Sequence, residues 1–138
     1  MDAKKDIQHQ ERSVDVSAGP VTLKGILAVP QDAKGLVLFA HGSGSSRFSP
    51  RNNFVARVLQ ECGLATLLID LLTEDEARDR RLVFDIDLLA ERLRAATAWL
   101  QQTPETKDLR IGYFGASTGA AAALKAAAEE GANIGAIV

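Results

Sequence analysis

The segment LRIGYFGASTGAAAA, Leu109–Ala123, decides the fold of this 138-residue chain. It predicts a short apolar strand, a tight turn and an alanine-rich helix, and the turn GASTG at 115–119 fits the nucleophile-elbow pattern G-x-S-x-G. A serine on so tight a turn takes an unfavourable backbone conformation, and Gly115 and Gly119 remove the side chains that would crowd it. We therefore expect the Ser117 hydroxyl to stand above the sheet, beside helix-opening N–H groups that face negative charge. The alternative is a glycine-rich strand–helix turn with no catalytic use.

The composition is that of an ordinary globular protein, with 46% hydrophobic and 25% charged residues, so we expect one domain, residues 1–138. The net charge of −2 and the lack of a basic stripe argue against a nucleic-acid surface. The single cysteine, Cys62, excludes an internal disulfide and indicates no metal site, and we expect it to be buried at a helix end. The polar N-terminus and the lack of a membrane-length apolar run predict a cytoplasmic protein with no membrane partner.

Four strands are expected before the elbow. The first two flank the turn signal Gly19-Pro20 and therefore form an antiparallel hairpin. The other two are continuous apolar runs, which are typical of parallel strands covered on both faces. In chain order these strands are Ile7–Val16, Val21–Val29, Gly35–Ala40 and Leu64–Ile69.

The first long helix begins with Ser49 as N-cap and Pro50 as the first helical residue, runs to Glu61, and is closed by Gly63. We expect its apolar residues to share one face; they are Phe54, Val55, Val58 and Leu59.

The second long helix is capped by Asp85 and runs to Gln102. Its apolar positions recur at helical spacing: Ile86, Leu89, Ala90, Leu93, Thr97 and Leu100. Before it, Leu71–Arg81 forms a charged connection. We interpret its charge run as a solvated face, with a flap beside the site as the alternative; the run is Glu74, Asp75, Glu76, Arg78, Asp79, Arg80 and Arg81. The elbow helix stops at Gly131, and Ile134–Val138 begins another strand.

A hairpin followed by repeated strand–helix units predicts an α/β fold with a mostly parallel sheet and helices on both faces. Functional side chains of such sheets collect at the carboxyl ends of the strands. His41, Ser43, Asp70 and Ser117 all fall at such ends.

A serine nucleophile also requires hydrogen-bond donors for the oxyanion that it creates, and each donor lowers the barrier by ~3–4 kcal/mol. The N–H of Thr118, directly after the serine, would be one donor. The N–H of Ser43, in the small-residue loop after His41-Gly42, would be the other.

The pairing of this loop with the elbow resembles the α/β-hydrolases, and most closely their dienelactone-hydrolase-like branch. The resemblance extends from about Val21 onward, on HGSGSSR at 41–47, LLIDLLTEDE at 67–76 and GYFGASTGAAAAL at 112–124. It implies that Ser117 is the nucleophile of a Ser–His–Asp triad acting on carboxylic esters or related acyl compounds, without a cofactor. It also implies that His41 and Gly42 support the oxyanion loop. Some dienelactone hydrolases carry cysteine at the nucleophile position, so serine favours esterase chemistry.

The chain departs from the family where the acid and base are concerned. In this fold both follow the nucleophile in chain order, whereas the two histidines, His9 and His41, precede Ser117. We interpret His9 as a surface residue and His41 as a support for the oxyanion loop, with a role as base the alternative. Asp70 suits a hydrogen-bonding role better than that of triad acid.

We therefore expect the 138 residues to be the N-terminal part of a larger hydrolase, truncated after the sixth strand. A C-terminal segment or a second chain would supply the missing histidine and acid. The strand Ile134–Val138 would lie at an edge of the sheet, where unpaired backbone groups and apolar side chains favour pairing with another chain.

Two further hypotheses stay open at this point. The first is a non-catalytic scaffold or interaction subunit, favoured by the missing histidine. The second is dinucleotide binding, suggested by Gly112, Gly115 and Gly119; their spacing is G-x-x-G-x-x-x-G instead of G-x-G-x-x-G, and no suitable acidic residue follows.

Overall fold

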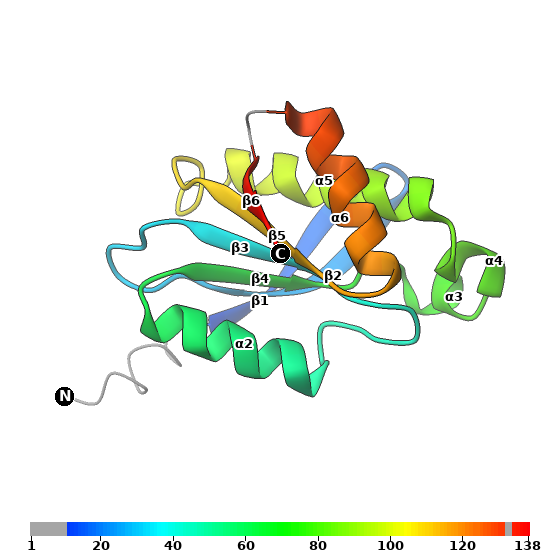
Figure 1. Cartoon of the computed structure of the whole chain (residues 1–138), viewed down its shortest axis with the longest axis horizontal. Helices are drawn as coiled ribbons and strands as arrows, with labels where there is room; N and C mark the ends of the chain where they lie inside the picture. Colours follow the sequence, from blue (N-terminus) through cyan, green and yellow to red (C-terminus); the bar gives the residue numbers. More distant parts are fainter. Residues whose placement is uncertain (1–10, 132–133) are drawn as a thin grey trace.

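A six-stranded mixed sheet with helices on both faces forms the molecule (Figure 1). The computed structural model describes residues 11–131 and 134–138. The strands lie in the order β1-β2-β4-β3-β5-β6. Figure 1 shows α2 on one face, α5 and α6 on the other, and α3 and α4 at one end of the sheet. The strands are β1 (Glu11–Ala18), β2 (Val21–Ala28), β3 (Leu36–Ala40), β4 (Ala65–Ile69), β5 (Ile111–Gly115) and β6 (Ile134–Ile137). The helices are α2 (Pro50–Glu61), α3 (Glu74–Ala77), α4 (Arg80–Val83), α5 (Ile86–Gln102) and α6 (Thr118–Glu130).

The expected fold class is confirmed. β1 and β2 pair antiparallel as a hairpin, and β2 also pairs antiparallel with β4. The remaining neighbours, β4-β3, β3-β5 and β5-β6, are all parallel. The part of the expected first strand at 7–10, together with His9, lies outside the described residues. Because the four parallel strands end at the same edge, the loops after β3, β4 and β5 meet there.

Local signals place the helix ends correctly. The Ser49 side chain accepts a hydrogen bond from the N–H of Asn52, and the Asp85 side chain accepts one from Leu88. Gly63 and Gly131, just past α2 and α6, have φ of 87° and 61°, which glycine adopts without steric cost.

The buried face of α2 matches the expected one in part, since Val55 and Leu59 pack against the core while Phe54 and Val58 do not. Asn52, Ala56 and Gln60 face the sheet, whereas Phe54 is 62% exposed and Val58 43% exposed. Small Ala56 allows the helix to approach the strands, and the Gln60 side-chain nitrogen donates to the Thr66 hydroxyl at 2.7 Å. This hydrogen bond pairs the Gln60 nitrogen in the interface, a contact that apolar spacing alone cannot predict, while the Gln60 Oε1 has no partner among the described residues.

Cys62 at the end of α2 is exposed, so the prediction that it is buried is wrong. It occupies the C-cap position of α2, just before the turn that leads into β4. No helix in the described part of the chain combines the length and the apolar character needed to cross a membrane.

The strand beneath the elbow is fixed to α5 by a buried hydrogen bond. Tyr113 on β5 is 1% exposed, and its hydroxyl lies 2.6 Å from that of Thr97. Burial raises the pKa of Tyr113 to about 12, so its hydroxyl stays protonated at neutral pH. β5 is therefore held by side-chain bonding as well as by its neighbouring strands.

Candidate active site

Ser117 forms the turn between β5 and α6 in a strained backbone conformation. Its φ and ψ are 57° and −127°, a region that residues with a Cβ rarely enter, at a cost of about 1–3 kcal/mol. Hydrogen bonds across the turn stabilise it: Gly119 N–H donates to the carbonyl of Ala116 at 2.9 Å, and Ala120 N–H to that of Ser117 at 3.0 Å. Ser117 is exposed, as expected of a nucleophile at an elbow.

The glycines on either side of Ser117 are required by close backbone packing. A Cβ on Gly119 would lie 2.5 Å from the carbonyl oxygen of His41 and closer still to that of Ala40. A Cβ on Gly115 would lie 2.6 Å from the Gly119 carbonyl oxygen. Both glycines therefore allow α6 to begin directly against the end of β3. This packing accounts for them without a bound dinucleotide.

The loop after β3 lies against the elbow. A Cβ on Gly42 would be 3.1 Å from the Cβ of Ser117 and 3.2 Å from the carbonyl oxygen of Ala116. The fold thus brings together the two segments that the sequence predicts to share one acyl group.

Some backbone N–H groups at this junction have no hydrogen-bond acceptor within the described residues, among them those of Ser43 and Thr118. The first-turn N–H groups of Gly119, Ala120 and Ala121 donate to carbonyls of the elbow, and the N-cap Ser117 makes no side-chain capping bond. Within the described ranges, no acceptor is found for the N–H of Thr118 or of Ser43. Such unpaired donors are what an oxyanion or a carbonyl oxygen would accept from.

Both ring nitrogens of His41 are bound to backbone groups. Nε2 accepts the N–H of Leu71 at 3.0 Å, so Nδ1 carries the proton and donates it to the carbonyl oxygen of Gly42 at 2.9 Å. The ring therefore links the ends of β3 and β4 and has no nitrogen left to receive a proton from Ser117. This geometry favours the supporting role over that of base.

Asp70 holds the far end of the same loop. Its Oδ1 accepts the backbone N–H of Arg47 at 2.6 Å, and its Oδ2 pairs with the Arg47 guanidinium. Both carboxylate oxygens are thus used by one residue, which agrees with a hydrogen-bonding role for Asp70.

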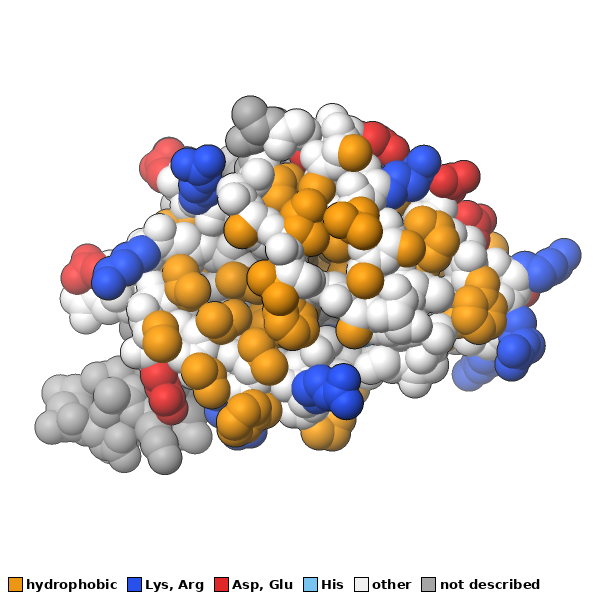
Figure 2. All heavy atoms as spheres, in the orientation of Figure 1, with side chains coloured by type: hydrophobic (Ala, Val, Ile, Leu, Met, Phe, Trp, Pro, Cys, Tyr) orange, Lys and Arg blue, Asp and Glu red, His pale blue; other side chains and the backbone are white. Residues whose placement is uncertain are grey.

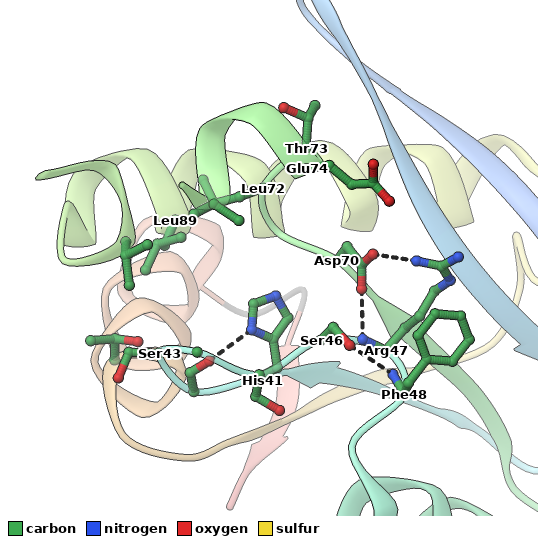
Figure 3. A pocket seen from close by; sticks show the side chains of 16 residues that line it. His41, Ser43, Ser46, Arg47, Phe48, Asp70, Leu72, Thr73, Glu74 and Leu89 are labelled. Atoms are coloured by element: carbon green, nitrogen blue, oxygen red, sulfur yellow. Dashed lines mark hydrogen bonds and ion pairs between the residues drawn. The ribbon is translucent and has the colours of Figure 1, made fainter. Parts of the chain in front are cut away.

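A cavity of about 330 Å³ opens beside the loop and the start of α6 (Figure 3). Figure 3 shows Leu72 and Leu89 reaching in from the helical side, while His41 and Ser43 come from the loop after β3. Thr118 lines the cavity, and Ser117 adjoins it through Gly42. The lining residues are His41, Gly42, Ser43, Gly44, Ser45, Ser46, Arg47, Phe48, Asp70, Leu72, Thr73, Glu74, Ala77, Val83, Leu89 and Thr118.

Most charged side chains of Leu71–Arg81 are exposed, as expected of a solvated face. The same segment also forms a wall of the cavity, which agrees with the alternative of an element beside the site. It folds into the short helices α3 and α4, and Leu72 and Val83 line the cavity. Thr73 and Glu76 form a reciprocal capping box at the start of α3. The spacing T-x-x-E is a capping signal that the sequence carries and that could have revealed this helix.

Arg92, within the predicted apolar stripe of α5, anchors this wall. It is 6% exposed and donates to both carboxylate oxygens of Glu76 at 2.7 Å. The hydrogen bonds from Arg92 lower the pKa of Glu76 from 4.5 to about 2, against the opposing effect of burial. Nothing in the apolar periodicity singles out this pair.

Glu76→Gln is expected to lower the free energy of unfolding by about 2–3 kcal/mol at pH 7, because it leaves the buried Arg92 cation without its counter-charge. The folded-state pKa of Glu76 is depressed, so the stabilisation is complete above about pH 4.5 and declines as the pH falls toward 2. Urea unfolding of both proteins at pH 7 and pH 3 measures this difference. It should shrink at pH 3; a difference independent of pH would contradict the role given to this ion pair.

Comparisons with known proteins agree with this architecture. No protein-family model matches the chain. A dienelactone hydrolase from Anabaena variabilis is 61% identical with a TM-score of 0.90, over 93% of this chain and 61% of that one. Est1E from Butyrivibrio proteoclasticus, at 20% identity, has a TM-score of 0.77 over 91% of this chain and 49% of its own, and shows likeness in fold alone.

A curated Mycobacterium tuberculosis protein, described as "putative phosphoribosyl transferase", is 55% identical over all 138 residues. The chain spans 31% of that protein's length and 61% of the Anabaena hydrolase. The chain therefore resembles a dienelactone hydrolase in sequence, and its sheet topology is that of the α/β-hydrolase fold.

Proposed function

We propose that this chain carries the nucleophile, the oxyanion donors and a substrate-cavity wall of an esterase-like serine hydrolase, acting on carboxylic esters or related acyl compounds. The observation that carries the proposal is the exposed, strained Ser117 packed against Gly42, with the unpaired N–H groups of Ser43 and Thr118 beside it. The likeness to hydrolases supports the reaction class.

In the proposed reaction, the Ser117 oxygen attacks the acyl carbonyl carbon while a base takes the hydroxyl proton. The carbonyl oxygen becomes an oxyanion and accepts hydrogen bonds from the N–H groups of Ser43 and Thr118. The C–O bond to the alcohol then breaks and the alcohol leaves with the proton. Water next attacks the acyl-serine, the base takes its proton, and the acid product is released as Ser117 regains its hydroxyl.

The base is proposed to come from outside the described residues, since both nitrogens of His41 are engaged. A C-terminal segment or a second chain would supply a histidine and an acid. The Anabaena hydrolase, of which the chain covers 61%, is long enough to contain such a segment.

The β6 edge is the proposed place where that segment joins the sheet. Hydrophobic side chains gather across this face of the molecule, over α2 and around β6 (Figure 2). Ile137 is 42% exposed and Val138 76% exposed. An apolar strand at an edge of the sheet favours such pairing.

The reaction in the mycobacterial relative's name is no part of this proposal, because the chain matches 31% of that protein. A non-catalytic scaffold is the second candidate. The observation that favours it is the engagement of both His41 nitrogens, which leaves Ser117 without a base among the residues described.

A fluorophosphonate probe separates these two functions. We would compare the 138-residue chain alone with a hybrid in which it replaces the matched part of the Anabaena dienelactone hydrolase, at 61% identity. The hybrid should be labelled rapidly, the chain alone slowly, and the hybrid with Ser117→Ala not at all. A folded hybrid that stays unlabelled would favour the scaffold, and labelling that survives Ser117→Ala would exclude Ser117 as the nucleophile.

A further inference from the structure

Leu71, the second residue after β4, is held by side chains at both of its backbone polar groups. Its N–H donates to His41 Nε2 at 3.0 Å, and its carbonyl oxygen accepts from Arg92 Nη1 at 3.3 Å. Its own side chain is fully buried. The position of this residue is therefore set jointly by the loop after β3 and by α5.

Arg92 is itself held in one orientation. Its two terminal nitrogens each donate to a different oxygen of Glu76, the paired geometry that fixes a guanidinium plane. Glu76 is in turn held by Thr73, whose N–H donates to Glu76 Oε1 at 3.0 Å. The Leu71 carbonyl oxygen thus accepts a hydrogen bond from a guanidinium group, that of Arg92, whose orientation is fixed.

On its other side, His41 is one of two groups that hold the Gly42 carbonyl oxygen, the other being the Ser45 N–H, which donates to it at 3.1 Å. The His41 Nδ1–H donates to the carbonyl oxygen of Gly42. That carbonyl and the N–H of Ser43 belong to the same planar trans peptide, in which they point in opposite directions. Holding the Gly42 oxygen therefore aims the Ser43 N–H.

We propose that Arg92, oriented by Glu76, is a positioning residue for the Ser43 N–H, acting through Leu71 and His41; this rests on the proposed function. The hydrogen bonds form one path from α3 and α5 to the oxyanion loop. Loss of Arg92 frees the Leu71 carbonyl, so that the 71–72 peptide can turn about the Leu71 Cα; this movement shifts the preceding peptide, whose Leu71 N–H orients the His41 ring. The Gly42–Ser43 peptide can then rotate away from the substrate oxygen.

The kinetic test uses the hybrid and p-nitrophenyl acetate. Removing an oxyanion donor outright costs about 10²–10³ in kcat, so misorienting one through Arg92→Gln is expected to lower kcat about 10–100-fold, with KM nearly unchanged. Arg92→Lys should recover part of the loss, and Glu76→Gln/Arg92→Gln should lose little more than Arg92→Gln, since both residues act along one path.

Arg94→Gln is the matched control, because Arg94 lies on the same helix but pairs with Glu129 on α6. It should leave kcat unchanged. An Arg92→Gln hybrid that keeps its kcat, or that changes kcat and KM only as Arg94→Gln does, would overturn the proposal.

The exchange rate of the Leu71 N–H tests the same series of hydrogen bonds, and it does so without substrate turnover. Arg92→Gln should speed exchange of the Leu71 N–H by tenfold or more, on the order of one lost hydrogen bond, and Arg94→Gln should not. Unchanged Leu71 exchange in a folded Arg92→Gln hybrid would overturn the proposal by itself. A hybrid without Ser117-dependent turnover would instead remove the proposed function, and the exchange result would still decide whether Arg92 holds this peptide.

Discussion

Replacing Ser117 with alanine in the hybrid is expected to lower kcat/KM for p-nitrophenyl acetate by about 10⁴–10⁶-fold. The reason is that alanine removes the atom that forms the acyl bond, while leaving the backbone donors and the cavity in place. The residual rate should be that of the oxyanion donors and binding alone. Steady-state kinetics on folded protein, matched by thermal unfolding, measures the change.

Ser43→Ala is the control for this experiment. The proposed donor at that position is the backbone N–H, which alanine keeps, so the activity should change by less than about threefold. A loss as large as that of Ser117→Ala would mean that the Ser43 hydroxyl takes part in the chemistry. Activity retained in Ser117→Ala would contradict the proposed nucleophile.

The second large effect, on the free energy of unfolding, is expected when Gly119 is replaced by alanine. Alanine there would place its Cβ against the carbonyl oxygens of Ala40 and His41, and both are backbone atoms that cannot move aside as a flexible side chain would. The variant must therefore separate α6 from β3, so we expect a loss of about 3 kcal/mol or more and a fall in Tm of roughly 10 °C. Thermal unfolding measures it.

Gly19→Ala provides the comparison. Gly19 has a φ of 62° with no neighbouring atom within 4 Å, so alanine meets backbone strain alone, at about 1 kcal/mol. A Gly119→Ala variant as stable as Gly19→Ala would show that the elbow does not pack as tightly as described.

The elements that the sequence predicted are those that depend on local signals. The caps Ser49 and Asp85, the glycines 63 and 131 and the apolar runs of the parallel strands each act within a few residues, and the structure has them where expected. The face of α2 was predicted only in part: Val55 and Leu59 pack on the core, but Phe54 and Val58 are exposed. Gln60 is inside because it bonds to Thr66, which lies on another element.

In the candidate site, too, the residues with local sequence signals were predicted and those that depend on tertiary contacts were not. The elbow and the loop after β3 were found because both are compact motifs, with glycines at positions where any larger residue would collide. Arg92 and Glu76 were not found, because their importance comes from a tertiary contact between two helices, 16 residues apart, which no local pattern signals. From sequence alone, an arginine in a helix is predicted to be exposed to solvent, unless its carboxylate partner is known.

We propose that the Ser117 oxygen attacks an acyl carbon whose oxygen accepts hydrogen bonds from the N–H groups of Ser43 and Thr118. A crystal structure of the hybrid after reaction with a fluorophosphonate tests it most directly, since the bound phosphonate imitates the tetrahedral intermediate. We expect a bond from phosphorus to Ser117 Oγ, with the phosphoryl oxygen about 2.7–3.1 Å from the backbone nitrogens of Ser43 and Thr118. An adduct on another residue, or a phosphoryl oxygen turned away from both N–H groups, would contradict it.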